Sequence, residues 1–255
     1  MFSKTAPSPV LDLNADLGEG GFQDEVVLRH VSSASIACGG HAGDAATMRE
    51  SLRLCAMYGV EAGAHPSFPD RANFGQQAMN LPAVEVMALV REQLEQLKEI
   101  ADEVGVTLCH VKLHGMLATV ASQQPTVARA VAQAVHAAEL HRVYVRAGAD
   151  CELRREVSAL GLEVVAEGFA DRGYAADGTL LPDPHPQAVL PYERSLAQGL
   201  DIGLRGTARA VTGELVSIPA QSLGVHAYLP EAPRLVRDLS AALRQAGIRL
   251  GNSCA

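Results

Sequence analysis

Tryptophan is absent from this 255-residue chain, and aromatic residues make up only 4% of it. Lysine is almost as scarce, because the chain has only Lys4, Lys98 and Lys112. The formal net charge is −8, from 21 Lys and Arg against 29 Asp and Glu. Proteins that bind nucleic acids rely on basic surfaces, often interleaved with aromatic side chains. The composition therefore argues against a nucleic-acid partner and favours a small-molecule enzyme.

Long apolar runs are also missing. No uninterrupted stretch approaches the ~18 residues that a membrane helix needs, and the N-terminal residues lack the apolar run of a secretory signal. We therefore expect no membrane association and a cytoplasmic location. The five cysteines are scattered and include no CxxC pair, so a disulfide framework or a thiolate zinc site is not expected. For Cys38, a small buried thiol is a better interpretation than a nucleophile.

Three catalytic signatures are absent. The chain contains no GxxxxGK[ST] phosphate-binding loop, no HExxH zinc motif and no GxSxG nucleophile elbow. A P-loop ATPase, a zincin protease and a typical serine hydrolase are therefore excluded as interpretations.

Strand-like and helix-like segments alternate along the whole chain. We expect strands over 10–14, 33–38, 61–67, 107–115, 142–148, 162–169, 215–219 and 222–226. Helices are expected from the N-cap Asp44 to near Gly59, from Pro82 to Gly105, around 127–135, between 148 and 162, and over about 231–246, while 171–192 has the composition of a loop. Repeated alternation predicts a parallel sheet covered by helices. We expect one α/β domain over 1–255, a barrel rather than an open doubly wound sheet.

Two of these segments carry polar side chains at alternate positions, which places them on one face of a strand. In the first segment these side chains are Asp12, Asn14 and Asp16. In the second they are His110, Lys112 and His114. Burying such lines of polar groups is unfavourable without partners or function. The alternatives are ordinary turn chemistry for the first segment and an exposed edge strand for the second.

Further polar groups follow the ends of predicted strands, where barrel enzymes place their sites. Asp16 and Glu19 lie where the first strand opens into a loop that contains Gly18 and Gly20, and a carboxylate there suits acid–base work. His41 lies among glycines ahead of the helix cap Asp44. His65 lies just after the strand portion of 61–67 and ahead of two prolines. We expect His41, His65 and His114 to lie together, although a single histidine of this kind is more often structural. The spacing of these groups does not by itself indicate a metal.

Taken together, these segments resemble the LamB/YcsF family, whose bacterial members include the A subunit of 5-oxoprolinase. The resemblance rests, in family order, on LDLNADLGEG (11–20), IACGGHAGD (36–44), GAHPSFPD (63–70), HVKLHGML (110–117) and AEGFADRGYAADGTLLP (166–182), with a weaker match at LGVHAYLPEA (223–232). The chain departs from the family pattern at Gly40, where an aromatic residue is usual, at Leu113, where proline is usual, and at Ala227, which follows His226 in place of glycine.

The resemblance implies a distorted (β/α) TIM-like barrel related to carbohydrate deacetylase barrels. It also implies ATP-dependent opening of 5-oxoproline to L-glutamate, together with partner subunits B and C. ATP, with Mg, would be a co-substrate, which fits the missing P-loop if the nucleotide contacts partner subunits or a site of another type. The implied substrate is a small carboxylate, and a homo-oligomer is compatible with the family.

Roles follow from the resemblance and from the chemistry of the side chains. The expected catalytic residues are Asp16 as general base, His65 and His114 as acid–base or electrophilic groups, and Lys112, which would hold the substrate carboxylate or a phosphorylated intermediate. The residues expected to bind or position substrate are Asn14, Glu19, His41, Asp44 and Glu167.

Two other functions are consistent with the same residues. A metal-dependent, deacetylase-like hydrolase would bind a divalent ion at a site including Asp16, His65 and His114. A non-catalytic regulatory or binding subunit would account for the altered segments around Leu113 and Ala227.

Overall fold

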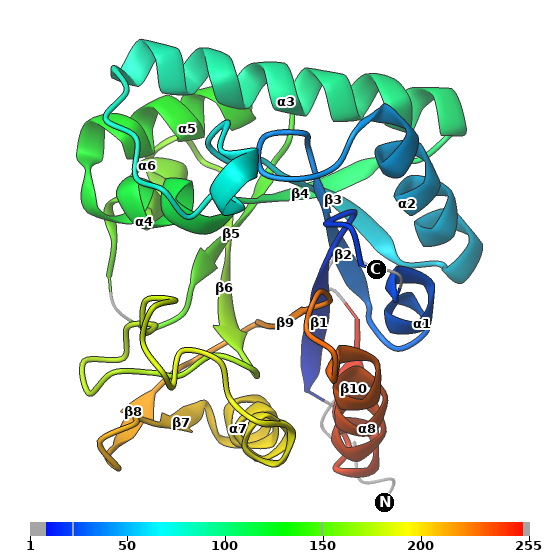
Figure 1. Cartoon of the computed structure of the whole chain (residues 1–255), viewed down its shortest axis with the longest axis vertical. Coiled ribbons are helices and arrows are strands. Elements are labelled where there is room, and N and C mark those ends of the chain that lie inside the picture. Colours follow the sequence, from blue (N-terminus) through cyan, green and yellow to red (C-terminus); the bar gives the residue numbers. More distant parts are fainter. Residues whose placement is uncertain (1–8, 22, 149, 252–255) are drawn as a thin grey trace, which may run out of the picture.

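Parallel strands and helices alternate through a computed structural model that describes residues 9–21, 23–148 and 150–251. Within these residues, seven parallel strands close into a barrel, confirming the expected fold class (Figure 1). In ring order they are β1 (Val10–Leu17), β2 (Ser33–Ala37), β3 (Glu61–His65), β4 (Leu108–Lys112), β5 (Arg142–Arg146), β6 (Glu163–Phe169) and β9 (Ser222–His226). The ring closes where β9 pairs with β1, and β10 (Arg249–Leu250) extends the other edge of β1.

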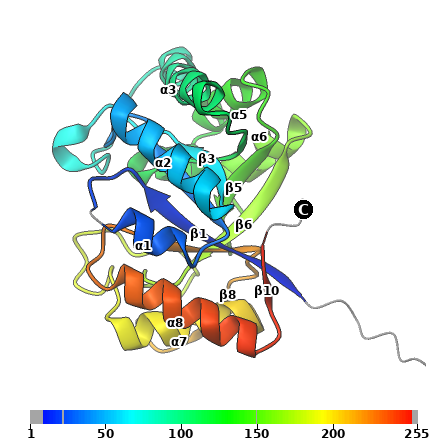
Figure 2. The same ribbon diagram turned by 90° about the vertical axis from the view of Figure 1, so that its right-hand side faces the viewer.

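The helices surround this barrel. They are α1 (Asp24–Leu28), α2 (Ala45–Tyr58), α3 (Ala83–Val104), α4 (Gly115–Gln123), α5 (Pro125–Ala137), α6 (Glu152–Ala159), α7 (Tyr192–Arg205) and α8 (Ala232–Gln245). Figure 1 shows α3 and α5 along one side of the barrel and α7 and α8 along the opposite side. Figure 2 shows α2, α1 and α8 one below the other on the outside of the barrel, with α1 between the other two. None of the described helices combines the length and the apolarity that crossing a membrane requires.

The alternation of side chains along β1 divides the apolar core from a polar barrel interior. Leu11, Leu13, Ala15 and Leu17 are buried in the hydrophobic cluster. The intervening Asp12 faces inward, where its Oδ2 accepts hydrogen bonds at 2.8 Å from the hydroxyls of Ser33, Tyr144 and Ser222. These hydrogen bonds join the interior of β1 to β2, β5 and β9.

The second polar line also faces the barrel interior. His110 is fully buried, lies 3.1 Å from the Ser35 hydroxyl and stacks on Tyr144 with ring centroids 4.3 Å apart. The alternative of an exposed edge strand for 107–115 is therefore wrong. The strand is also shorter than predicted, because β4 ends at Lys112 and α4 begins at Gly115.

The region after β6 differs most from the sequence prediction. Residues 215–219 supply only β8 (Leu215–Ser217), which pairs with β7 (Thr207–Arg209) in an antiparallel hairpin outside the barrel. The helix α7 was not predicted, because Gly199 and Gly203 interrupt its apolar pattern. Both glycines are packing positions, since a Cβ on Gly203 would lie 2.7 Å from a methyl of Leu243 in α8.

Candidate active site

Polar side chains gather at the mouth formed by the carboxyl ends of the parallel strands. Glu19 lies two residues beyond β1, and His41 lies in the loop between β2 and α2. His65 is the last residue of β3, and His114 directly precedes α4. The structure therefore brings together the three histidines that the strand ends predicted, and adds Glu19 to them.

The loop that carries His41 depends on glycine. Gly39 and Gly43 have φ angles of +91° and +80°, which side-chain-bearing residues rarely adopt. Arg71 fixes this loop by donating hydrogen bonds to the carbonyl oxygens of Gly39 at 3.0 Å and Gly43 at 2.7 Å. The tight turn aims the His41 ring at the mouth of the barrel.

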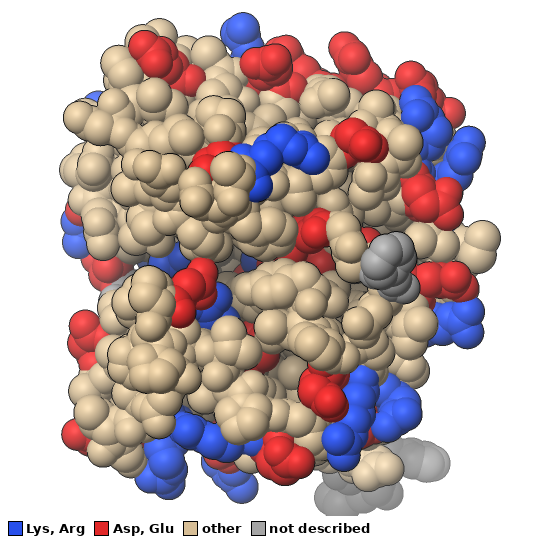
Figure 3. All heavy atoms as spheres, in the orientation of Figure 1, with Lys and Arg blue, Asp and Glu red and all other residues tan. Residues whose placement is uncertain are grey.

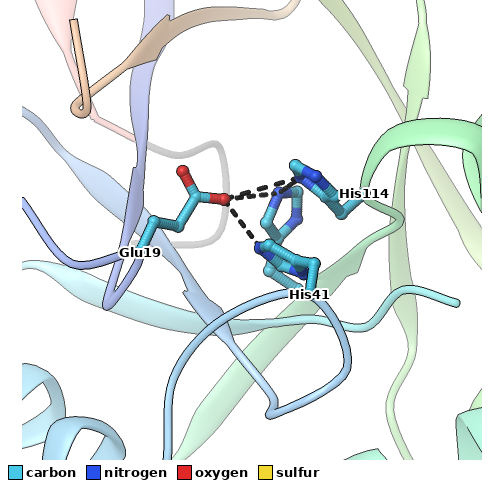
Figure 4. A group of neighbouring side chains, drawn as sticks. Glu19, His41 and His114 are labelled. Atoms are coloured by element: carbon cyan, nitrogen blue, oxygen red, sulfur yellow. Dashed lines mark hydrogen bonds and ion pairs between the residues drawn. The ribbon is translucent and has the colours of Figure 1, made fainter. Parts of the chain in front are cut away.

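One oxygen of Glu19 contacts all three imidazoles. Its Oε1 lies 2.8 Å from Nε2 of His41, 3.7 Å from Nε2 of His65 and 3.5 Å from Nδ1 of His114. One ligand atom from each of these four residues lies within 4.8 Å of the others. Figure 4 shows the carboxylate of Glu19 pointing at His41 and His114. We call Glu19, His41, His65 and His114 the mouth cluster.

Backbone carbonyls determine the protonation of two rings. Nδ1 of His65 lies 2.7 Å from the Lys112 carbonyl oxygen, and Nε2 of His114 lies 2.8 Å from the Phe74 carbonyl oxygen. A carbonyl oxygen only accepts, so each of these nitrogens carries its ring's hydrogen. In the neutral rings the other nitrogens present lone pairs, and these two nitrogens face each other at 3.0 Å. A proton or a metal cation between them would remove that repulsion.

The mouth cluster has the chemistry of a divalent transition-metal site. Burial lowers the pKa of His41 and of His114 to about 4 and holds the pKa of His65 well below its ordinary value, so all three rings are neutral at pH 7. Neutral imidazole is the metal-binding form, and its other N–H on a carbonyl is typical of metal ligands. Among the described residues, Nδ1 of His41 and Oε2 of Glu19 are buried without a hydrogen-bond partner. Three imidazoles and one carboxylate suit zinc and related ions.

A second group joins the strands β1, β4 and β6. Nζ of Lys112 lies 2.8 Å from Oδ1 of Asp16, 3.1 Å from Oε2 of Glu167 and 3.1 Å from Oδ1 of Asn14. Burial alone would raise the pKa of Asp16, but the positive charges that His65, Lys112 and His226 can carry outweigh it and hold that pKa far below its usual range. Burial raises the pKa of Glu167 to about 7, with Lys112 opposing the shift.

An Asp–His pair faces Asp16 from the other side of the mouth. Oδ1 of Asp171 lies 3.0 Å from Nδ1 of His226, and Oδ2 of Asp171 accepts the backbone N–H of His226 at 2.7 Å. Nε2 of His226 lies 3.9 Å from Oδ2 of Asp16. Burial alone would lower the pKa of His226, but Asp171 more than compensates and raises it. From the sequence, neither His226 nor Asp171 has an expected role, although the place of Asp171 two residues after the predicted strand 162–169 is a usable signal.

Two residues considered from the sequence lie outside this arrangement. Asp44 is exposed, and its carboxylate caps α2 by accepting the backbone N–H of Thr47 at 2.9 Å. Its position gives no support to the expected role in substrate binding. Cys38 is buried, and burial raises the pKa of its thiol to about 12, as suits a packing residue.

A cavity of about 870 Å³ opens at the same mouth. Its lining includes Asp16, His65, Lys112, His114, Glu167 and His226. In the space-filling view a hollow crosses the face of the molecule, and Lys and Arg atoms are visible within it (Figure 3). The carboxylates, the lysine and two of the mouth-cluster imidazoles are thus accessible to a small molecule.

Fold and site together define a parallel (β/α) barrel protein with a polar, metal-compatible centre at its carboxyl-terminal mouth. The chain belongs to the LamB/YcsF family, whose model matches residues 11–254. The resemblance drawn from the sequence motifs is therefore confirmed.

Two solved structures resemble this chain over nearly its whole length. The chain is similar to a lactam utilization protein from Thermus thermophilus, with 36% identity and a TM-score of 0.85 over 94% of this chain and 98% of that one. It also shares its fold with a family 4 carbohydrate esterase from Streptomyces lividans, with 12% identity and a TM-score of 0.52 over 96% and 93% of the two chains. The expected relationship to carbohydrate deacetylase barrels is thereby confirmed at the level of the fold.

Proposed function

We propose that this chain is the catalytic subunit of a cytoplasmic hydrolase that opens a small lactam, 5-oxoproline, to L-glutamate. The observation that carries the proposal is the placement of an ionised Asp16 opposite the Asp171-oriented His226 in one cavity. Membership of the LamB/YcsF family and the similarity to a lactam utilization protein support a lactam as the substrate class.

Opening a lactam by water needs a base for the water and an acid for the departing ring nitrogen. Asp16 stays ionised, so Oδ2 can accept a hydrogen bond from the attacking water while Lys112 binds Oδ1. Its lowered pKa makes Asp16 a weaker base than Glu167, so its contribution rests on its position. His226, held by Asp171, can donate a proton from Nε2. Glu167, whose pKa is raised to about 7, is a second carboxylate able to exchange a proton near neutral pH. A metal in the mouth cluster, when bound, would polarise the lactam carbonyl or a water.

ATP and partner subunits complete the proposal. A five-membered lactam carbonyl is a weak electrophile, so phosphoryl transfer from MgATP would activate it. The chain has no P-loop, and we expect subunits B and C to contribute to nucleotide binding.

The test is release of glutamate that depends on both ATP and 5-oxoproline, measured for the chain alone and with subunits B and C. We expect turnover with the partners and a loss of about 10²–10⁴-fold in Asp16→Asn, as for removal of a general base. A smaller loss in Glu167→Gln would identify Asp16 rather than Glu167 as that base. No release from an active partner preparation would refute the assignment. Unchanged turnover in both Asp16→Asn and His114→Ala would favour a non-catalytic subunit.

A second candidate is a metal-dependent, deacetylase-like hydrolase, which the mouth cluster favours. The ion expected from sequence analysis would contact Asp16, His65 and His114. The geometry instead groups His65 and His114 with Glu19 and His41, while Oδ2 of Asp16 lies 3.6 Å from Nε2 of His65. Elemental analysis of protein purified without chelators should find a stoichiometric divalent ion that is lost in His41→Ala. Its absence from the wild-type protein would count against this candidate.

A further inference from the structure

Within the part of the chain that the structure describes, Arg146 is a cation in the cavity without a counter-ion. It is the last residue of β5 and is paired in register with Glu167 of β6. It lies two residues beyond Tyr144, whose side chain points into the barrel to Asp12, so Arg146 belongs to the same inward face. Arg146 lines the same cavity as Asp16 and His226.

The contacts of the guanidinium leave most of its donors free. Nη1 of Arg146 donates a hydrogen bond to the Thr119 hydroxyl at 3.2 Å. Among residues 9–21, 23–148 and 150–251, no carboxylate lies within ion-pair distance of it. Burial, reinforced by the nearby Arg172, lowers the pKa of Arg146. A guanidinium offers five N–H donors, so several of them can serve a ligand.

Among the described residues, the other Lys and Arg side chains that line the cavity are already neutralised. The three hydrogens of the Lys112 ammonium face Asp16, Glu167 and Asn14. Arg172 forms an ion pair with Asp183 at 2.5 Å and donates to the carbonyl oxygens of Ala188 and Leu181. To bind Lys112 or Arg172, an anionic ligand would have to displace a carboxylate. At Arg146 it would displace none.

We propose that Arg146 binds the carboxylate of the lactam substrate, a role that sequence analysis gave to Lys112. This proposal rests on the proposed function. The planar guanidinium can hold a carboxylate through two parallel hydrogen bonds. Arg146 lies one strand from Glu167 and one strand from Lys112 on the other side. It lines the same cavity as Asp16, so in this proposal the substrate carboxylate faces Arg146 and the lactam carbonyl faces Asp16. A neutral lactam would leave the half-buried charge unpaired.

The test compares two lactams that differ only in the carboxylate. In the complex reconstituted with subunits B and C and ATP, kcat/KM is measured for 5-oxoproline and for 2-pyrrolidinone, the same ring without the carboxyl group. We expect the wild-type protein to prefer 5-oxoproline and Arg146→Gln to lose about 10- to 100-fold on 5-oxoproline alone, the usual effect of removing a hydrogen bond to a charged group. Arg146→Lys should recover part of this loss.

Arg91→Gln is the matched control, because it removes the same charge from an exposed residue of α3 that pairs with Glu95 on the same helix, away from the cavity. It should leave both lactams unaffected, and unchanged 2-pyrrolidinone kinetics in Arg146→Gln would show that the cavity is intact. Equal losses on both lactams, no preference in the wild-type protein, or an increased KM for ATP in place of 5-oxoproline would each overturn the proposal. Absence of turnover of either lactam by the wild-type complex would refute the proposed function, and this inference with it.

Discussion

Asp171 acts on the site by orienting the ring of His226. Both of its oxygens contact His226, one at the ring and one at the backbone N–H. The ring therefore keeps its orientation, and its Nε2 faces the cavity. This arrangement makes the proton on His226 more stable than burial alone would allow.

The pH dependence of the reaction should report this pairing. Because the pKa of His226 is raised, the acid form persists to higher pH, and kcat/KM should fall as pH rises through that pKa. Asp171→Asn removes the negative charge, so burial then lowers the pKa, and we expect the basic limb of the profile to move down by about 1 to 3 pH units. His226→Gln, measured in parallel, should remove that limb. An unchanged limb in Asp171→Asn would exclude His226 as the acid.

Among the strands, a glycine marks a position where the backbone of one strand lies close to a side chain of its neighbour. Gly63 of β3 is opposite His110 of β4, next to an irregularity in the strand register. A Cβ on Gly63 would lie 2.3 Å from the His110 ring, which is held by Ser35 and Tyr144. The absence of a side chain at Gly63 thus makes room for a buried imidazole beneath the active site.

Overpacking at this contact should be measurable. We expect Gly63→Ala to lower the free energy of unfolding by about 1–3 kcal/mol, the usual range for an added methyl in a filled core. Urea denaturation followed by circular dichroism would measure it. Gly63→Ala combined with His110→Ala should be more stable than the sum of the two single effects predicts, because the clash is then gone. Strict additivity would contradict this explanation.

Local signals made some elements predictable and left others hidden. The Asp44 cap and the Gly59 terminator gave α2 its predicted ends, and alternation along 12–20 identified the inward face of β1. By contrast, α7 could not be predicted, because Gly199 and Gly203 are required by packing against residues distant in the sequence, above all Leu239 and Leu243 of α8. For the same reason Asp171 and His226 could not be paired: they belong together only because β6 lies beside β9. The role of Lys112 was also hidden, because its carboxylate partners come from β1 and β6.

For the whole molecule, the mouth cluster connects four consecutive strands of the barrel. Its residues follow or end β1, β2, β3 and β4, which are neighbours in the ring. A bound ion would cross-link these strand ends in the folded chain and not in the unfolded one. Metal binding and global stability are therefore linked.

Thermal unfolding should reveal this linkage. At a free Zn²⁺ concentration about 100 times its Kd, the ion would add about 2.7 kcal/mol, which corresponds to a rise in Tm of about 5 to 10 °C for a chain of this size. EDTA should reverse the rise, and His41→Ala should abolish it without changing the response to Mg²⁺. An equal response to Zn²⁺ in His41→Ala would place the ion elsewhere.

Closure of the barrel by β1 and β9 has a consequence for biosynthesis. Asp12 on the first strand hydrogen-bonds to Ser222, which follows it by 210 residues. At ~5–20 residues per second, about 10 to 40 s separate the synthesis of the two. During that interval β1 has emerged from the ribosome with Asp12, Asn14 and Asp16 still lacking some of their final partners. The nascent chain can fold the helices of its first half early, but its catalytic centre can form only near the end of translation.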